Sequence, residues 1–384
     1  MEKRRLAIFA LGGVGIGAFS QGLPTIGRIV ERLGDELDIT FYSLDTTDPA
    51  FRPAGYVLRS PPAWLSRLPI RWIRWFVLLL YFVGDHLRRR HQVLMSLWGY
   101  PMGTFVVALA RLVRRPSVVL LLGAELADLP EIGYGALRHP RSRRLVMWTC
   151  RHAAHLVVIS EHQRELLRQN GVARADVQVI PWGADPAQFP FVEKAPGSPL
   201  KIVHVANLTE VKDQATLVRA FGLVRARLPA KLRIVGPDFM NGRIHALVTD
   251  LGLIADVDFV GAVPFARVVE HYRWADMFLL TSLSEGQNGA LTEAVACGVL
   301  AVGTPVGLVH DLGRAAAVVV APEDPADIAE KIGAIVADRA AWASKVARAR
   351  QWSEAHTFDW TVGALARVVR EAAGAAVPEV SARD

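Results

Sequence analysis

Two glutamates, Glu285 and Glu293, lie eight positions apart on either side of a predicted helix start. An apolar run at 278–280 is typical of a strand, a polar loop with glycine follows, and the helix ends at Gly298. The first N–H groups of a helix lack partners within it and bind anions such as a diphosphate. A carboxylate beside bound phosphates can accept hydrogen bonds from ribose or hexose hydroxyls. The segment therefore predicts a sugar-nucleotide site. In the alternative interpretation, Glu293 only complements the helix dipole and Glu285 is solvated.

A lysine occupies a comparable place earlier in the chain. Lys212 follows a predicted strand at 202–206 and precedes a predicted helix at 213–228. Carboxyl ends of parallel strands meet at one edge of a sheet, so Lys212 would direct its charge at the same anion site and stabilise a departing diphosphate. The alternative is an exposed loop lysine, in a chain that has only seven lysines.

The elements that must position these residues alternate between strands and helices in both halves of the chain. Continuous β-branched and leucine-rich runs are expected of parallel strands that are buried on both faces. The predicted strands are 6–11, 39–44, 93–97, 117–122, 156–159 and 177–180 in the first half, and 202–206, 232–235, 258–260, 277–280, 299–302 and 317–320 in the second.

The length of 384 residues exceeds what one hydrophobic core supports. A linker rich in proline and glycine at 190–200 divides the chain. We predict an α/β protein with one domain at 1–190, a second at 191–355, and a final helix within 356–384 that packs back on the first. Each domain is doubly wound on a parallel sheet, and the functional site lies in the cleft between them, outside the carboxyl ends of the strands.

The charge of the chain is unevenly distributed. Residues 1–190 carry 24 basic and 15 acidic side chains, a balance of +9, whereas the rest of the chain is near neutral. The first half therefore predicts an anionic partner: a nucleic acid, a phospholipid or an acidic acceptor. Its short arginine clusters lack aromatic platforms, which argues against a nucleic acid. Two distant cysteines and scattered histidines predict neither a disulfide framework nor a metal site.

Two segments bear on membranes and targeting. The basic start and apolar run at 6–19 are typical of a signal peptide, but the glycines, helix pattern and strand that follow indicate a first β-loop-α-β unit, so we expect a cytoplasmic protein. The uncharged segment Trp75–Gly84 is too short for a bilayer, which needs about 20 apolar residues. Its flanking arginines and interleaved tryptophans fit an in-plane anchor on an anionic membrane; a buried helix with solvated arginines is the alternative.

Taken together, these segments resemble glycosyltransferase family 4, whose members are retaining enzymes of the GT-B fold, with two Rossmann-like domains facing a central cleft. The similarity runs from Leu200 to about Gly313 and includes the Glu-x7-Glu motif at Glu285 and Glu293 and the Val-Lys-Asp-Gln segment around Lys212. Further similar segments are 232–236, 258–263 and 274–280 in the second half, and Ser160 and 180–185 in the first.

The resemblance implies a role for each matching residue. Lys212 would neutralise the donor diphosphate, Glu285 would hold the transferred sugar, and Glu293 would bind the ribose diol. Asn288, Gly289, Ala290 and Leu291 would offer backbone N–H groups to the phosphates. Gly13 and Gly15 belong to the glycine loop of the first domain, which would let the backbone approach the donor or the acceptor closely. The remaining positions are Val263 in the base-binding segment and Asn207 beside the lysine.

Two positions depart from the family pattern. Many members have an arginine in a Gly-Arg-Leu segment, where this chain has Asn207, so one cation is missing. Many have a histidine after the fourth strand of the first domain, where this chain has Glu125 nearby. Glu125 is a candidate general base for the acceptor, and a structural carboxylate is the equal alternative.

The resemblance implies a metal-independent enzyme without a cofactor. It would move a hexose from a nucleoside diphosphate sugar to a saccharide or lipid-linked acceptor in polysaccharide biosynthesis. The nucleoside diphosphate of the donor would be UDP or GDP. The basic first domain would be the acceptor side, at the inner face of a membrane, and no nucleic acid is expected as a partner. A UDP-sugar epimerase or hydrolase and a non-catalytic subunit that binds nucleotide sugars are the alternatives.

Overall fold

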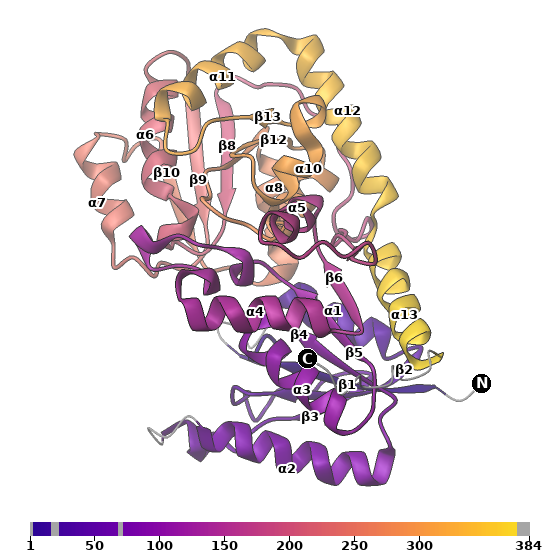
Figure 1. Ribbon diagram of the computed structural model, residues 1–384. Coiled ribbons are helices and arrows are strands. Elements are labelled where there is room, and N and C mark those ends of the chain that lie inside the picture. The colour runs from indigo at the N-terminus through magenta and orange to yellow at the C-terminus, as the bar shows by residue number, and fades with distance from the viewer. Residues whose placement is uncertain (1–2, 17–22, 68–71, 375–384) are drawn as a thin grey trace.

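The computed structural model describes residues 3–16, 23–67 and 72–374, and within these ranges the chain forms two parallel β-sheets (Figure 1). The first sheet has the strand order β3-β2-β1-β4-β5-β6-β7, and the second the order β10-β9-β8-β11-β12-β13. All the strand pairs are parallel. In both sheets the chain starts near the centre, proceeds to one edge and then returns to build the other. The predicted pair of doubly wound α/β domains is confirmed.

The strands of the first sheet are β1 (Arg4–Ala10), β2 (Leu37–Ser43), β3 (Tyr56–Arg59), β4 (Val93–Leu97), β5 (Ser117–Leu121), β6 (His155–Val158) and β7 (Gln178–Val179). Those of the second are β8 (Leu200–Val205), β9 (Ala230–Val235), β10 (Val257–Gly261), β11 (Met277–Leu280), β12 (Leu300–Gly303) and β13 (Val318–Val319). The central strands are the predicted apolar runs, and every residue of β4, β5, β11 and β12 is buried. Burial on both faces explains why these strands were recognisable in the sequence.

One strand was missed. The strand β3 lies at the edge of the first sheet, where only Tyr56 is buried and the other three residues are half-buried. Its apolar run is only three residues long, at 56–58, and its place in the sheet depends on pairing with β2 from Ile39 to Tyr42.

Helices cover both sheets. Those of the first domain are α1 (Pro24–Leu33), α2 (Trp72–Arg89), α3 (Thr104–Leu112), α4 (Pro140–His152) and α5 (Glu161–Gln169). Those that follow are α6 (Gln214–Arg225), α7 (Arg243–Asp250), α8 (Val268–Trp274), α9 (Gly289–Ala296), α10 (Gly307–Ala316), α11 (Pro325–Ala337), α12 (Arg339–Ala355) and α13 (Phe358–Gly374). In the described ranges no helix is long and apolar enough to cross a membrane.

The last two helices extend from the second domain back to the first. Helix α12 runs along the second domain, and α13 continues from it to the first (Figure 1). Val362, Leu365 and Val369 of α13 belong to the same buried core as strands β1, β2, β4 and β5. The predicted domain boundaries at 190 and 355 stay predictions, and 375–384 of the predicted last segment lie outside the described residues.

The two domains also meet through polar contacts at the carboxyl ends of their strands. The Ser160 hydroxyl donates to the carbonyl of Gly286 at 2.5 Å, and the backbone N–H groups of Glu161 and His162 donate to the Asp311 carboxylate at 2.8 and 3.0 Å. Asp311, from α10, thereby complements the N-terminus of α5 in the other domain.

We expect Leu365→Ala to destabilise the first domain, because it opens a cavity between α13 and the sheet. The cost for a buried leucine is about 2–5 kcal/mol, and Leu365 is 1% exposed. Urea unfolding followed by tryptophan fluorescence measures the loss. The control is Leu223→Ala on α6, where the side chain is 40% exposed. Equal stability of the two variants would contradict the packing of α13 on the first sheet.

Candidate active site

Three donors converge on one carboxylate oxygen in the loop between β11 and α9. Oε1 of Glu285 accepts hydrogen bonds from Lys212 Nζ at 2.6 Å, from the Ser282 hydroxyl at 2.8 Å and from Asn288 Nδ2 at 2.8 Å. The Thr281 hydroxyl connects this loop to the loop between β8 and α6, because it donates to the carbonyls of Lys212 and Asp213 at 3.0 and 2.9 Å. The structure thus brings Lys212 and Glu285 together across 73 positions of sequence.

The contacts of Glu285 decide its protonation state. Burial alone would raise its pKa, but the Lys212 charge and the hydrogen bonds from Lys212, Asn288 and Ser282 outweigh burial, and they hold the pKa below the usual value of a glutamate. Glu285 is therefore ionised at neutral pH. All three donors reach Oε1, so Oε2 is the oxygen that can accept hydrogen bonds from a ligand.

The N-terminus of α9 lies three residues further along. Asn288 adopts a positive φ of 83°, and its Oδ1 accepts the Leu291 N–H at 2.8 Å. This cap corrects one prediction: the Leu291 N–H is occupied by a side chain and is not free for phosphate. The backbone N–H groups of Gly289 and Ala290 have no partner within the described part of the chain, and they are the donors that remain.

Glu293 is buried in an environment opposite to that of Glu285. Its Oε2 accepts the Tyr272 hydroxyl at 2.8 Å. Burial raises the pKa of Glu293 to about 7, against the opposing effects of the Tyr272 hydrogen bond and the positive charge of Arg28. Glu293 is therefore close to half-protonated at neutral pH, and a ligand that donates hydrogen bonds to it would favour its charged form.

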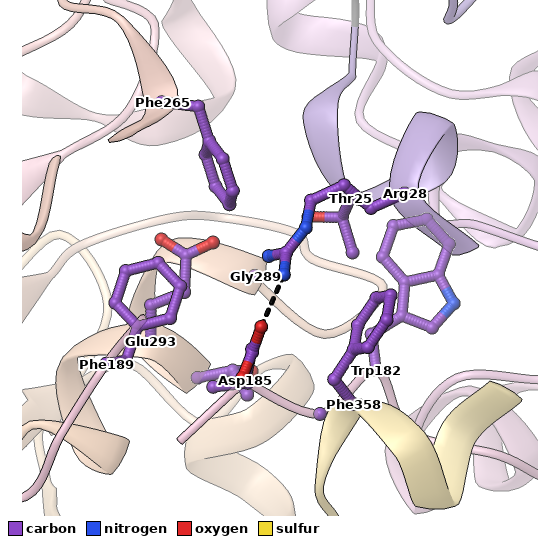
Figure 2. A pocket seen from close by; sticks show the side chains of 12 residues that line it. Thr25, Arg28, Trp182, Asp185, Phe189, Phe265, Gly289, Glu293 and Phe358 are labelled. Carbon is purple, nitrogen blue, oxygen red and sulfur yellow. Dashed lines mark hydrogen bonds and ion pairs between the residues drawn. The ribbon is translucent and has the colours of Figure 1, made fainter. Parts of the chain in front are cut away.

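Glu293 lines a pocket between the two domains, shown in Figure 2. Figure 2 shows the Glu293 carboxylate turned toward the pocket, with Phe265 above it and the Arg28 guanidinium between Phe265 and Phe358. The lining residues are Thr25 and Arg28 of α1, Trp182, Gly183, Ala184, Asp185 and Phe189 of the interdomain segment, Phe265, Gly289, Thr292 and Glu293 of the second domain, and Phe358 of α13.

Arg28 is one of several pocket residues that the sequence reasoning missed. Its guanidinium donates to Asp185 Oδ2 at 2.6 Å and to Gln188 Oε1 at 2.7 Å, and it lies 4.8 Å from the ring centre of Phe358. A single arginine in a helix among many arginines carries no signal in the sequence. Only the approach of α1 to 182–189 and to α13 places it here.

Glu125 differs from its predicted role as a general base. It is buried, its Oε1 accepts the N–H groups of Gly99 and Leu122 at 2.8 and 3.2 Å, and its Oε2 accepts that of Gly123 at 2.7 Å. Both oxygens are committed to the backbone of the loops after β4 and β5. These are the contacts of a structural carboxylate, the second of the two alternatives.

The other predicted residues lie around the cleft without lining this pocket, among the residues described. Gly13 and Gly15 follow β1 with positive φ, and a Cβ on Gly15 would lie 2.7 Å from the Phe51 ring. Asn207 is exposed after β8, where its carbonyl accepts Gln214 Nε2 at 3.1 Å. Val263 is half-buried after β10. In the described ranges no group of three or more histidine, cysteine, aspartate or glutamate side chains could hold a metal ion.

Gln287 and Gly286 show how closely the domains approach at this site. Gln287 Oε1 accepts the Trp182 N–H at 2.7 Å, and its Nε2 donates to the Trp182 carbonyl at 2.8 Å. A Cβ on Gly286 would lie 2.2 Å from the carbonyl oxygen of Leu122. The loop that carries Glu285 therefore forms part of the domain interface, and glycine is required where it touches the first domain.

Comparison with known proteins gives a family for each domain. Residues 199–338 match the family model described as "Glycosyl transferases group 1", and residues 24–183 match the "Glycosyl transferase 4-like domain". D-inositol 3-phosphate glycosyltransferase of Nocardia farcinica is 29% identical over 239 residues, 56% of this chain and 53% of the relative. A putative colanic acid biosynthesis glycosyltransferase, WcaL of Escherichia coli K12, is 32% identical over 157 residues, 39% of each protein. The chain thus spans about half, or less, of the length of these curated relatives.

Solved structures support the same fold. Sucrose-phosphate synthase of Thermosynechococcus elongatus superposes with a TM-score of 0.79 at 17% identity, over 96% of this chain and 99% of that one. HepE of Anabaena in complex with UDP and glucose superposes with a TM-score of 0.71 at 16% identity, over 96% and 100%. These are GT-B glycosyltransferases, and the predicted GT-B fold is confirmed. With one model of the family matching each of its two domains, the chain belongs to glycosyltransferase family 4.

Proposed function

We propose that the protein is a retaining, metal-independent glycosyltransferase, which moves a hexose from a nucleoside diphosphate sugar to a saccharide or lipid-linked acceptor. The observation that carries the proposal is the position of Lys212 and Glu285 beside the uncapped N–H groups of Gly289 and Ala290. The complexes of HepE with UDP, glucose and UDP-glucose support a UDP-sugar donor; GDP is the second candidate.

The donor diphosphate would lie at the N-terminus of α9. The N–H groups of Gly289 and Ala290 and the ammonium of Lys212 would face the negative charge that grows on the diphosphate as the sugar departs. Fixed donors of this kind need no reorganisation during the reaction, so the catalytic effect is one of electrostatics and positioning.

The two glutamates would divide the hydroxyl groups of the donor between them. Glu285 is ionised and has Oε2 available, so it would accept hydrogen bonds from the hexose. Glu293 would accept them from the ribose diol, with the Tyr272 hydroxyl holding its carboxylate in place. Charged acceptors of this kind form stronger hydrogen bonds than neutral ones and orient the sugar over the diphosphate.

Retention of configuration would follow from attack on the face that the diphosphate leaves. The bond from the anomeric carbon to the diphosphate oxygen breaks, and the bond to the acceptor oxygen forms on the same side. Glu125 is committed to three backbone N–H groups, so the acceptor proton would pass to the departing phosphate oxygen. With a lipid-linked acceptor, the enzyme would work as a peripheral protein at the inner face of an anionic membrane.

We expect UDP or GDP to raise the temperature of thermal unfolding, since a ligand that binds the folded state alone stabilises it. Turnover of a panel of nucleotide sugars should fall by on the order of 10²–10³ in Lys212→Ala, which removes one charge from the leaving group. The control is Lys331→Ala, which removes a lysine paired with Asp327 at 2.9 Å on the surface of α11. Undiminished turnover in Lys212→Ala would contradict the site.

The same assay separates the alternative functions. Consumption of a UDP-sugar without any added acceptor would indicate the epimerase or hydrolase. Nucleotide binding without turnover across a panel of saccharide and lipid-linked acceptors would indicate a subunit that only binds nucleotide sugars.

The pKa of Glu293 predicts a pH dependence of donor binding. A ribose diol donates hydrogen bonds, so it favours the ionised carboxylate, and this form is lost as the pH falls through about 7. Between pH 8 and pH 6 the affinity for UDP-glucose should fall about tenfold. UDP-glucose suits the titration because its phosphates do not titrate in this range. The affinity is measured by calorimetry.

Two variants test whether Glu293 causes this dependence. Glu293→Gln should weaken binding and remove its pH dependence. Tyr272→Phe should move the midpoint to higher pH, because the Tyr272 hydrogen bond lowers the pKa of Glu293. A pH dependence that persists in Glu293→Gln would show that another group is responsible.

A further inference from the structure

Helix α2 carries a continuous apolar stripe on its exposed face. Trp72, Phe76, Leu80, Val83 and Leu87 are spaced by four, four, three and four positions, so they lie on one face of the helix. Their exposed fractions are 67, 53, 54, 43 and 76%. Scattered apolar side chains are ordinary on a protein surface, whereas a contiguous patch of this kind marks an interaction site.

The opposite face of α2 is firmly packed. Leu78 and Phe82 are fully buried. The Asp85 carboxylate accepts two hydrogen bonds from the Arg59 guanidinium, at 2.9 and 3.0 Å, and one from the Tyr42 hydroxyl at 3.2 Å. These contacts attach the helix to β2 and β3 and fix which side it turns outward. The exposed stripe is therefore a stable feature of the folded protein.

The sequence segment that contains α2 is rich in arginine, and two of these arginines, Arg74 and Arg89, are paired with Asp45 and Asp38 from outside the segment. Residues 59–115 contain ten arginines and one acidic residue, Asp85, which is paired with Arg59. Their balance of +9 equals that of residues 1–190. Arg88 and Arg90 are exposed at the end of α2, and Arg111 and Arg114 are exposed at the end of α3. Burial lowers the pKa of His86, and the charge of Arg115 lowers it further, so the ends of these two helices are neighbours.

We propose that this α2 face, defined as the five stripe residues together with Trp64, Arg88, Arg90 and Arg114, docks on an anionic lipid bilayer. Trp64 is 61% exposed in the short turn Ala63–Arg67 that precedes the helix. The apolar stripe enters the boundary between headgroups and acyl chains, and the guanidinium groups bind lipid phosphates. Of the arginines predicted to flank the segment, Arg71 lies outside the described residues.

Charge selects the bilayer over a second copy of the chain. Two copies that met through α2 would bring two sets of arginines together, and like charges at an interface oppose association. An anionic membrane satisfies the apolar stripe and the arginines at once. Figure 1 shows α2 along the end of the first domain that lies away from the second, so a flat surface can approach it.

The path of the chain relates this face to the cleft. Helix α2 follows β3 and precedes β4, and β3 and β4 belong to one parallel sheet. The first turn of α2 therefore lies toward the carboxyl ends of the strands, the side on which the cleft opens. Trp64 and Trp72 are at this end. The docking depends on no step of the proposed transfer reaction, although it would hold the cleft near lipid-linked acceptors.

The experiment is vesicle flotation of the full chain without nucleotide. Vesicles of phosphatidylcholine containing phosphatidylglycerol should bind the protein, vesicles of pure phosphatidylcholine should bind it about tenfold less, and added salt should weaken the binding. The double variant Phe76→Ser/Leu80→Ser should weaken binding by about tenfold or more, because it removes two apolar side chains from the lipid. Arg88→Glu/Arg90→Glu should abolish the preference for phosphatidylglycerol.

The matched control is Leu251→Ser/Ile254→Ser, which removes apolar side chains of similar exposure, 45 and 63%, from the second domain and should leave vesicle binding unchanged. Thermal unfolding verifies that each variant folds, since exposed positions affect stability little. Equal binding to both kinds of vesicle, or equal loss in the stripe and control variants, would overturn the proposal. The proposal would also be overturned if the unaltered chain did not bind vesicles but formed a dimer, and if Phe76→Ser/Leu80→Ser dissociated that dimer. Loss of vesicle binding with intact turnover of a water-soluble acceptor would separate docking from transfer.

Discussion

The carboxylate of Glu285 is the interaction on which the rest of the site depends. Lys212, Ser282 and Asn288 all donate to one of its oxygens, and these donors come from two loops that follow different strands of the second sheet. The loop that carries Glu285 is in turn held by the first domain, through Ser160 and through the close approach to Leu122. The second domain therefore supplies the contacts of Glu285, and the first domain adds contacts to the loop that carries it.

The two glutamates of the motif show how the environment separates the roles of identical side chains. Glu285 is buried beside three hydrogen-bond donors, one of which is the ammonium of Lys212, and together they hold its pKa low. Glu293 is buried beside a single hydroxyl, and its pKa rises to about 7. Burial acts on both in the same direction, so the difference comes from the partners that the fold supplies.

The first domain combines two surfaces with different physical character. Toward the cleft it presents backbone loops ordered by Glu125, whose oxygens are satisfied by three N–H groups. At α2 it presents apolar and cationic side chains that do not line the pocket between the domains. One face of α2 is buried and anchored by Asp85, and the other exposes apolar side chains, so the interpretation as a buried helix holds for one face and the in-plane anchor stays a proposal.

The order of strands and helices, the division into two α/β domains and the Glu-x7-Glu segment could be predicted from the sequence, because each leaves a local pattern. Buried parallel strands are continuous apolar runs, and a strand, a polar loop and a helix follow one another within about twenty residues. The edge strand β3 was not predicted, because its apolar run of three residues is too short to be distinctive. The sequence by itself thus determined the fold class and the family of the chain.

The tertiary structure alone decided which polar groups are available to a ligand. Arg28 enters the pocket because α1 packs against a segment more than 150 positions away. The Leu291 N–H is taken by the Asn288 side chain, and Glu125 is enclosed by the loops after two strands. Hydrogen-bond partners depend on distances of a few ångströms between atoms whose separation in sequence is unrelated to their separation in space. No local spacing encodes them, and only the folded chain brings them together.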